Sequence, residues 1–358
     1  MPPSSTRLLL SINGGMCPCQ CYLTSFILFD RDQIALLYAF HFSVGYWGPL
    51  PVPPTTHYGA LTYLHDCITR FLDSKIVAGV QLIAYDFAKA FDTSPTNVIL
   101  NRLQSCDIPV PVFHWLESYL SDRRQYVSLG HSTSHLINVR SGVPQGSIIG
   151  PYLFSIVMGN LTFDESNCCA VRYADDVTMC LPLFKNSDNL HVKSAHDRLC
   201  NWSKENGLSL NLSKCKSILM SRCNDCVPFH LNYMYVSLIS NLKIIGVTFN
   251  DKCTWSDHFD NVLRASSRRL YPLRVLKNDY EVNDAFLCQV YFSTIRGLLE
   301  YCAPLFAGIS ATDSSRLERL QKRFHKLLCG TLCLKFTIIV FLISRLAENA
   351  KLCASLRK

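Results

Sequence analysis

From about residue 56 onward, the hydrophobic positions of the chain follow two different periods. Leu61, Leu64 and Ile68 are spaced three or four residues apart, which predicts an amphipathic helix. The continuous apolar run 80–85 instead predicts a buried strand, and this strand ends at Asp86. The pattern therefore predicts a mixed α/β fold in which an acid follows directly on a core strand.

The same two periods continue through the middle of the chain. Further helices are predicted over 97–106, 112–120 and 152–158, and short strands over 126–129 and 137–139. Two more strand-like runs, 168–173 and 177–181, are separated only by Ala174, Asp175 and Asp176. This spacing predicts a tight hairpin with both acids at its tip. From about residue 256 the pattern is mainly helical.

Composition indicates an ordered globular protein of 358 residues, 49% hydrophobic and 17% charged. The 18 cysteines form no small-domain framework, so we expect reduced thiols in the cytoplasm or nucleus. The clusters 17–21 and 223–226 each lack a second cysteine pair at zinc-finger spacing, which disfavours zinc. The apolar run 336–343 is too short to span a bilayer, and we expect no membrane association.

Positive charge is concentrated near the C-terminus. Residues 261–358 contain 16 lysines and arginines against 7 acids, whereas residues 1–260 contain 19 against 20. One predicted helix places Leu317, Leu320, Phe324 and Leu327 on an apolar face, opposite Arg316, Arg319, Lys322, Arg323 and Lys326, and Gly330 is a plausible stop. Such a helix is suited to grip a polyanion, or it is simply a solvated surface.

The adjacent acids Asp175 and Asp176 require compensation, because buried neighbouring carboxylates repel each other. Asp86 ends a different strand and could join them at one sheet edge. Carboxylate oxygens are the ligands that Mg²⁺ prefers, and two such ions can assist a phosphoryl transfer. The alternative for Asp86 is a helix cap.

Seven motifs in order resemble the reverse transcriptases of non-LTR (LINE-type) retrotransposons over roughly residues 55–330. They are YDFAKAFD (85–92), SGVPQGSIIGPYLF (141–154), RYADDVT (172–178), NWSKENGLSLNLSKCK (201–216), LKIIGVTFNDKCTWSDHF (242–259), LLEYCAPLFAG (298–308) and RLERLQKRFHKLLCG (316–330). The resemblance implies a right-hand polymerase fold. It places an α/β palm with a fingers remnant at 55–240, a mostly helical thumb at 241–330, a C-terminal tail at 331–358, and damaged fingers, otherwise unassigned, at 1–54.

The resemblance also implies roles for individual residues. Asp86, Asp175 and Asp176 would hold two Mg²⁺ ions, and Phe87, Ala88, Lys89 and Ala90 would run beside the incoming triphosphate. Phe91 would exclude a ribose 2′-hydroxyl, unless it is ordinary core packing. Gln145 and Gly146 belong to a loop that would support template and nucleotide.

Three further positions are basic. Lys214 would protonate the departing pyrophosphate, unless it is simply solvated. Arg172 either contacts nucleic acid or pairs with an acid. The exposed thumb residues Arg319, Lys322, Arg323 and Lys326 would bind the nucleic-acid backbone.

The function implied is RNA-directed DNA polymerisation, with an RNA template, a DNA primer and deoxynucleoside triphosphates as partners. Residues 1–54 lack the basic fingers segment of LINE-type enzymes, and no endonuclease precedes the palm, so we expect a truncated copy. The alternative is a catalytically dead remnant that only binds nucleic acid. A viral RNA polymerase shares the palm but is disfavoured by PQG and YADD.

Overall fold

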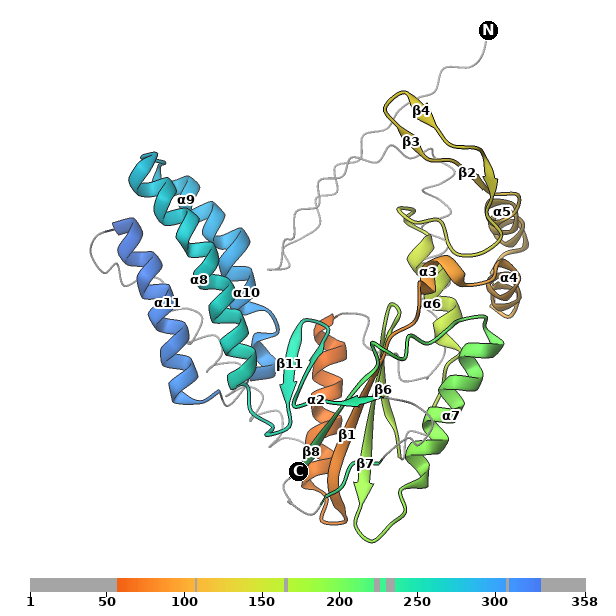
Figure 1. Ribbon diagram of the computed structural model, residues 1–358, viewed down its shortest axis with the longest axis horizontal. Helices are drawn as coiled ribbons and strands as arrows, with labels where there is room; N and C mark the ends of the chain where they lie inside the picture. The colour runs from red at the N-terminus through yellow and green to blue at the C-terminus, as the bar shows by residue number, and fades with distance from the viewer. Residues whose placement is uncertain are drawn as a thin grey trace. The chain divides into compact units, whose positions relative to one another are not determined.

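The computed structural model describes residues 57–106, 108–163, 167–221, 226–229, 236–306 and 309–329 (Figure 1). The chain divides into two compact units. One, here the ribbon unit, comprises residues 1–52 and 96–140; the other, the sheet unit, comprises residues 53–95 and 141–358.

A five-stranded sheet forms the centre of the sheet unit, in the order β6-β7-β1-β8-β9. The strands are β1 (Val77–Tyr85), β6 (Cys169–Tyr173), β7 (Asp176–Phe184), β8 (Lys216–Ser221) and β9 (Ser237–Leu238). β1 runs antiparallel to both β7 and β8, and β9 is parallel to β8. β1 is almost continuously apolar because both of its faces are buried.

Helices cover both faces of this sheet. α2 (His57–Asp73) buries Leu61, Leu64 and Ile68, as its spacing predicts, and shares a hydrophobic core with Val80 and Leu82 of β1. α7 (Leu190–Glu205) lies on the other face, where the Tyr85 hydroxyl hydrogen-bonds to a helix histidine. The sheet unit also contains the helices α3 (Ala90–Thr93) and α6 (Gly150–Gly159).

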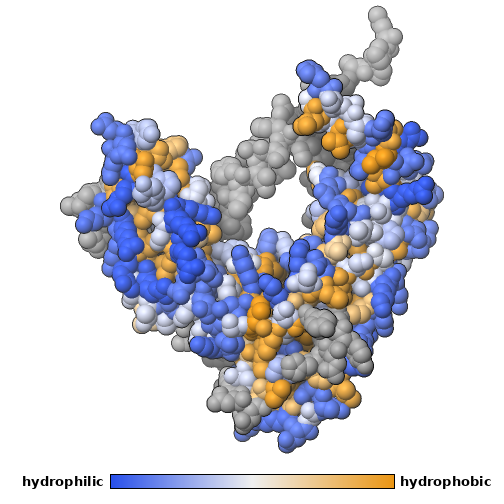
Figure 2. All heavy atoms as spheres, in the orientation of Figure 1, coloured by the Kyte–Doolittle hydropathy of each residue, from blue (hydrophilic) through white to orange (hydrophobic). Residues whose placement is uncertain are grey.

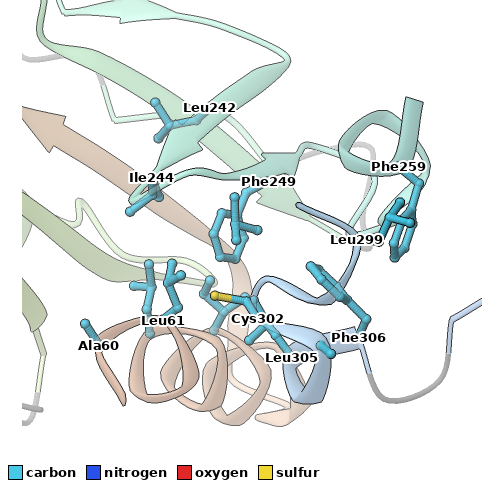
Figure 3. Packing of buried hydrophobic residues seen from close by; sticks show 14 of the residues in the cluster. Ala60, Leu61, Leu242, Ile244, Phe249, Phe259, Leu299, Cys302, Leu305 and Phe306 are labelled. Carbon is cyan, nitrogen blue, oxygen red and sulfur yellow. The ribbon is translucent and has the colours of Figure 1, made fainter. Parts of the chain in front are cut away.

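The C-terminal helices of the sheet unit share one core with α2. They follow the hairpin β10 (Asn241–Ile244) and β11 (Val247–Asn250), and comprise α8 (Ser256–Asp279), α9 (Asp284–Tyr291), the π-helix η1 (Phe292–Arg296), α10 (Gly297–Glu300), the 3₁₀ helix η2 (Ala303–Phe306) and α11 (Ala311–Cys329). Figure 3 shows Leu61 of α2 in the same hydrophobic layer as Cys302, which precedes η2, and Leu305 of η2. This shared core fixes the base of the helices on the sheet layer.

The ribbon unit contains α4 (Thr96–Gln104) and α5 (Val110–Leu120), followed by a two-stranded ribbon. The ribbon is built from β2 (Arg124–Gln125) paired with β5 (Ile137–Asn138), and β3 (Ser128–Leu129) paired with β4 (Ser132–Thr133). The short strands predicted over 126–129 and 137–139 are confirmed in part, since β3 covers 128–129 and β5 covers 137–138 while residues 126 and 127 lie outside strands.

One expectation about the cysteines is wrong. Cys67 of α2 and Cys169 of β6 form a disulfide, although scattered cysteines predicted reduced thiols throughout. The pair is 102 residues apart in sequence, and only the packing of α2 on the sheet edge brings it together. The described residues do not include the cysteine cluster 17–21, the part 223–225 of the second cluster, or the apolar run 336–343. Among the helices described, none combines the length and hydrophobicity needed to cross a membrane.

Candidate active site

The hairpin between β6 and β7 is tighter than its sequence suggests. Tyr173 pairs with Asp176, so only Ala174 and Asp175 form the turn and Asp176 is the first residue of β7. Ala174 adopts the left-handed conformation, with φ 52°. That conformation costs a residue with a Cβ about 1–2 kcal/mol. The turn is therefore held in a strained form that presents Asp175 at its tip.

The strand register brings Asp86 to the same sheet edge. Tyr85 is the partner of Val177, so Asp86, one residue further along β1, emerges beside Asp176, one residue before Val177. Asp176 is exposed, yet partial burial of its carboxyl raises its pKa, and repulsion from Asp175 and Asp86 raises it further. The three carboxylates thus act on one another, although they come from two separate segments of the chain.

The Asp86 carboxylate is incompletely compensated. Its Oδ2 atom is buried and has no hydrogen-bond partner in the described part of the chain. Lys214 Nζ lies 3.4 Å from that oxygen, which makes an ion pair without hydrogen-bond geometry. A buried carboxylate oxygen without a donor is unfavourable, and hard oxygen donors of this kind suit Mg²⁺. The donor set fits the predicted metal, although no group of three or more His, Cys, Asp or Glu side chains among the described residues is already arranged to ligate one.

The chain after Asp86 is tied to the segment that carries Lys214. The Ala88 amide donates to the Ser209 carbonyl at 2.8 Å, and the Asn211 amide donates to the Asp86 carbonyl at 2.8 Å. The Lys214 amide in turn donates to Asn211. These backbone bonds explain why a lysine 128 positions downstream lies beside the acid. Lys214 is 65% exposed, so it is both solvated and paired.

The loop 141–146 docks on α3. Gly142 N donates to the Ser94 carbonyl at 2.7 Å, and Val143 N donates to the Phe91 carbonyl at 2.8 Å. Gln145 Nε2 donates to Asp92 Oδ1 at 2.6 Å. The expectation that Gln145 bonds along a nucleic-acid strand is untested, and in this structure its amide is engaged within the protein.

The surroundings of Phe91 fit both of its proposed roles, sugar selection and core packing. Its ring stacks on Phe154 of α6, with 4.4 Å between ring centroids, and the residue is half-buried. Phe154 itself is fully buried. One face of the Phe91 ring thus packs on the core, while the exposed part remains available to a ligand.

Comparison with known proteins decides the family. Residues 63–253 match the family model described as reverse transcriptase (RNA-dependent DNA polymerase). The chain belongs to the reverse transcriptase family. The match includes the strand β1, the hairpin and the Lys214 segment, so all of the candidate acids lie inside it.

Curated relatives agree with that assignment. A probable RNA-directed DNA polymerase from transposon BS of Drosophila melanogaster is 27% identical over 252 residues, covering 66% of this chain and 28% of the relative. The RNA-directed DNA polymerase from mobile element jockey of the same organism is 27% identical over 264 residues, covering 68% and 28%. The chain thus spans under a third of these relatives. Among solved structures, Candida tropicalis telomerase in complex with a fragment of telomeric RNA aligns with a TM-score of 0.44 and 12% identity, covering 88% of this chain and 56% of that one.

Arg172 is bonded to a helix end and, among the described residues, to no acid, while its predicted contact with nucleic acid stays a prediction. Its Nη1 donates to the carbonyls of Met158 and Leu161 at the C-terminal end of α6. Burial lowers the pKa of its guanidinium. The arginine is a helix C-cap, satisfying carbonyls that have no partner within the helix. A sequence gives no sign of this because the helix end lies more than ten residues away.

We expect Arg172→Ala to lower the free energy of unfolding by about 1–3 kcal/mol, because it leaves partly buried carbonyls without a charged donor. Urea denaturation should show a lower midpoint with an unchanged slope. Arg198→Ala is the control, since Arg198 is exposed and donates to the Thr162 hydroxyl at 2.7 Å. Equal losses for both variants would remove the capping explanation.

The basic helix predicted near the C-terminus is α11, and its apolar face is buried through Leu317, Leu320 and Phe324. The basic residues proposed to bind nucleic acid are all exposed: Arg319, Lys322, Arg323 and Lys326. Arg316, predicted on the same helix face, differs from them. It is partly buried and forms ion pairs with Asp260 of α8 and Asp313.

A second basic surface lies on α8, within the basic C-terminal region. α8 exposes Arg264, Arg268, Tyr271 and Arg274, which recur every three or four residues along one face. No acid occurs between residues 261 and 278. This acid-free stretch is its signal in the sequence. In Figure 2, hydrophilic side chains cover much of α8 and α11.

Proposed function

We propose that the chain carries an RNA-directed DNA polymerase activity that joins a deoxynucleotide to the 3′-hydroxyl of a primer. One observation carries the proposal: Asp86, Asp175 and Asp176 meet at one sheet edge, and a buried oxygen of Asp86 lacks a hydrogen-bond partner among the described residues. Membership of the reverse transcriptase family supports it. RNA template, DNA primer and deoxynucleoside triphosphates are the proposed partners.

The three acids would hold two Mg²⁺ ions. When bound, such ions stabilise charge on the attacking and leaving oxygens of a phosphoryl transfer. The protein's own contribution is to fix the carboxylates before substrate binds. β1 and the β6–β7 hairpin carry Asp86 and Asp175 at the ends of paired strands, so hydrogen-bonded backbone holds both carboxylates in place.

Substrate contacts follow from the segments around these acids. The backbone from Phe87 to Ala90 would run beside the triphosphate, and Lys89 opens α3 in the left-handed conformation, with φ 51°. Lys214 would donate a proton from Nζ to the departing pyrophosphate, and its pairing with Asp86 keeps the ammonium near the reacting phosphates. Gln145 and Gly146 would support the template and nucleotide from the loop docked on α3.

Primer extension tests the proposal. The chain is given a homopolymer RNA template, a DNA primer, the complementary deoxynucleotide and Mg²⁺, and is compared with Asp175→Ala. Extension by the first protein but not by the second supports the polymerase. Hybrid binding without extension by either protein would instead favour the second candidate, a remnant that binds nucleic acid through its basic helices.

Sugar selection can be tested at Phe91. Phe91→Ala should raise ribonucleotide incorporation relative to deoxynucleotide incorporation at least about tenfold, because the exposed part of the ring no longer blocks a 2′-hydroxyl. Competition between the two nucleotides measures this ratio. Phe91→Leu, which keeps most of the bulk, should change it little. If Phe91→Ala is active and keeps the original ratio of ribonucleotide to deoxynucleotide incorporation, then Phe91 serves only in core packing.

The two basic helices predict a salt-dependent interaction. Replacing Arg319, Lys322, Arg323 and Lys326 together by glutamine should weaken RNA–DNA hybrid binding. It should also flatten the salt dependence by about 0.7–0.9 in log–log slope for each phosphate that the variant no longer neutralises. Replacing Arg264, Arg268 and Arg274 of α8 together by glutamine should likewise weaken hybrid binding and flatten its salt dependence.

The matched control for that experiment is Arg316→Gln. Arg316 forms ion pairs with Asp260 and Asp313, so its loss should lower stability and leave the salt slope unchanged. Equal affinity and equal slope in both multiple variants would make these helix faces ordinary solvated surfaces.

A further inference from the structure

The ribbon of the ribbon unit exposes large side chains that its own fold does not use. Tyr126 is 59% exposed, Val127 70%, Leu129 82% and Ile137 57%. In the described part of the chain no second layer buries these groups, and a two-stranded ribbon is only marginally stable without further packing. Side chains of this size left exposed on so small an element leave each face of the ribbon open to a partner.

The register separates these side chains onto two faces. Arg124 pairs with Asn138, and Gln125 pairs with Ile137. Further along, Ser128 pairs with Thr133, so the extra residue of the bulge lies in the returning strand and the segment 124–129 alternates regularly. One face, here the polar face, carries Arg124, Tyr126, Ser128, Thr133 and Asn138. The other, here the apolar face, carries Gln125, Val127, Leu129, Ser132 and Ile137.

Charge determines which partner the polar face suits. No acid occurs between Asp122 and Asp164, while Arg124 and Arg140 are exposed within this stretch. Arg123 is used internally, because its Nε donates to the Leu120 carbonyl. The exposed side chains of the polar face are therefore a guanidinium, an aromatic ring, two hydroxyls and an amide, with no carboxylate to repel a phosphate.

We propose that the polar face binds single-stranded RNA. An exposed tyrosine beside an exposed arginine can stack an unpaired base while the guanidinium contacts the adjoining phosphate. A duplex hides its base faces, so this pairing favours a single strand. The hydroxyls of Ser128 and Thr133 and the amide of Asn138 can bond to a ribose 2′-hydroxyl, which distinguishes RNA from DNA. The proposal extends the polymerase function, since it supposes that the chain handles an RNA strand.

The test compares hybrids with and without a single-stranded extension. The full chain is titrated with a blunt RNA–DNA hybrid and with the same hybrid carrying a 5′ single-stranded RNA overhang. The wild-type chain should bind the overhang substrate at least about tenfold more tightly. The double variant Arg124→Gln with Tyr126→Ala should lose that preference while binding the blunt hybrid as before.

The apolar face provides the matched control. Val127→Thr with Leu129→Thr changes two exposed positions of the same segment to residues that suit a strand, and this variant should keep the overhang preference. If the control variant also loses the overhang preference, the assignment of RNA binding to the polar face is overturned. The assignment is equally overturned if the polar-face variant keeps the preference. An equal preference for a DNA overhang would overturn the choice of RNA. All of these measurements are made without nucleotide, so a chain that fails to polymerise still decides the question.

Discussion

Asp86→Asn should abolish primer extension, by a factor on the order of 10³ or more, without lowering the stability of the fold. The activity falls because the amide cannot supply an anionic oxygen at the sheet edge where Asp175 and Asp176 emerge. Stability should hold because the replaced carboxylate has a buried oxygen without a hydrogen-bond partner in the described part of the chain. The ion pair between Asp86 and the exposed Lys214 contributes little to the free energy of unfolding, so its loss costs little stability.

The pH dependence of this variant follows from Asp176. Its pKa is raised in the folded protein above the ordinary value of 3.8, first by burial and then by repulsion from Asp175 and Asp86. A raised acid pKa means that the folded state holds the proton more tightly, so the group destabilises the fold as pH rises through this range. Asp86→Asn weakens that repulsion. The variant should therefore gain stability relative to wild type at neutral pH, and the gain should disappear in acid, below the ordinary aspartate pKa.

Primer extension and thermal unfolding in the absence of divalent metal measure the two effects. Asp92→Asn is the matched control, since Asp92 is an exposed carboxylate on α3 that accepts a hydrogen bond from Gln145 rather than ending a strand. It should retain most of the activity. An Asp86→Asn protein that polymerises at the wild-type rate, or that unfolds at neutral pH, would contradict the assignment of Asp86 to the site.

Local periodicity was sufficient for the elements that carry the acids. The apolar run before Asp86 and the two runs around Ala174 predicted β1 and the β6–β7 hairpin, because a buried strand and a short turn are specified by neighbouring residues. The family resemblance added Lys214, whose position beside Asp86 depends on backbone bonds between distant segments. No pattern in a single sequence specifies such long-range pairing.

Residues whose role depends on tertiary partners could not be read from the sequence. Arg172 is a helix cap only because α6 ends beside β6. Arg316 belongs to the apparent basic face of α11 by spacing, yet Asp260 of another helix engages it. The disulfide between Cys67 and Cys169 likewise depends on the packing of α2 against the sheet. In each case tertiary packing determines the partner of the residue. The spacing of hydrophobic residues along the sequence does not specify that partner.

Gly142→Ala should disable the site through the loop docked on α3, even though Gly142 is not proposed to touch substrate. Gly142 has φ +78°, and a Cβ there would lie 2.6 Å from the Asp92 carbonyl oxygen and 2.7 Å from the Asp92 Cα. These are backbone atoms of a short helix, so they cannot move aside as a flexible side chain would. The loop must shift, breaking the bonds from Gly142 to Ser94 and from Val143 to Phe91.

We expect Gly142→Ala to lower the free energy of unfolding by about 3 kcal/mol or more, combining the left-handed backbone cost with the broken hydrogen bonds. Primer extension should fall about 100-fold, because displacing a supporting segment by about 1 Å is enough to misplace a substrate. Gly146→Ala separates the two causes. Gly146 has nearly the same φ, +77°, but nothing lies within 4 Å of its would-be Cβ. It should therefore lose only the backbone cost, about 1–2 kcal/mol, in the free energy of unfolding. Equal losses in both alanine variants would mean that backbone conformation, and not the packing against α3, governs the loop.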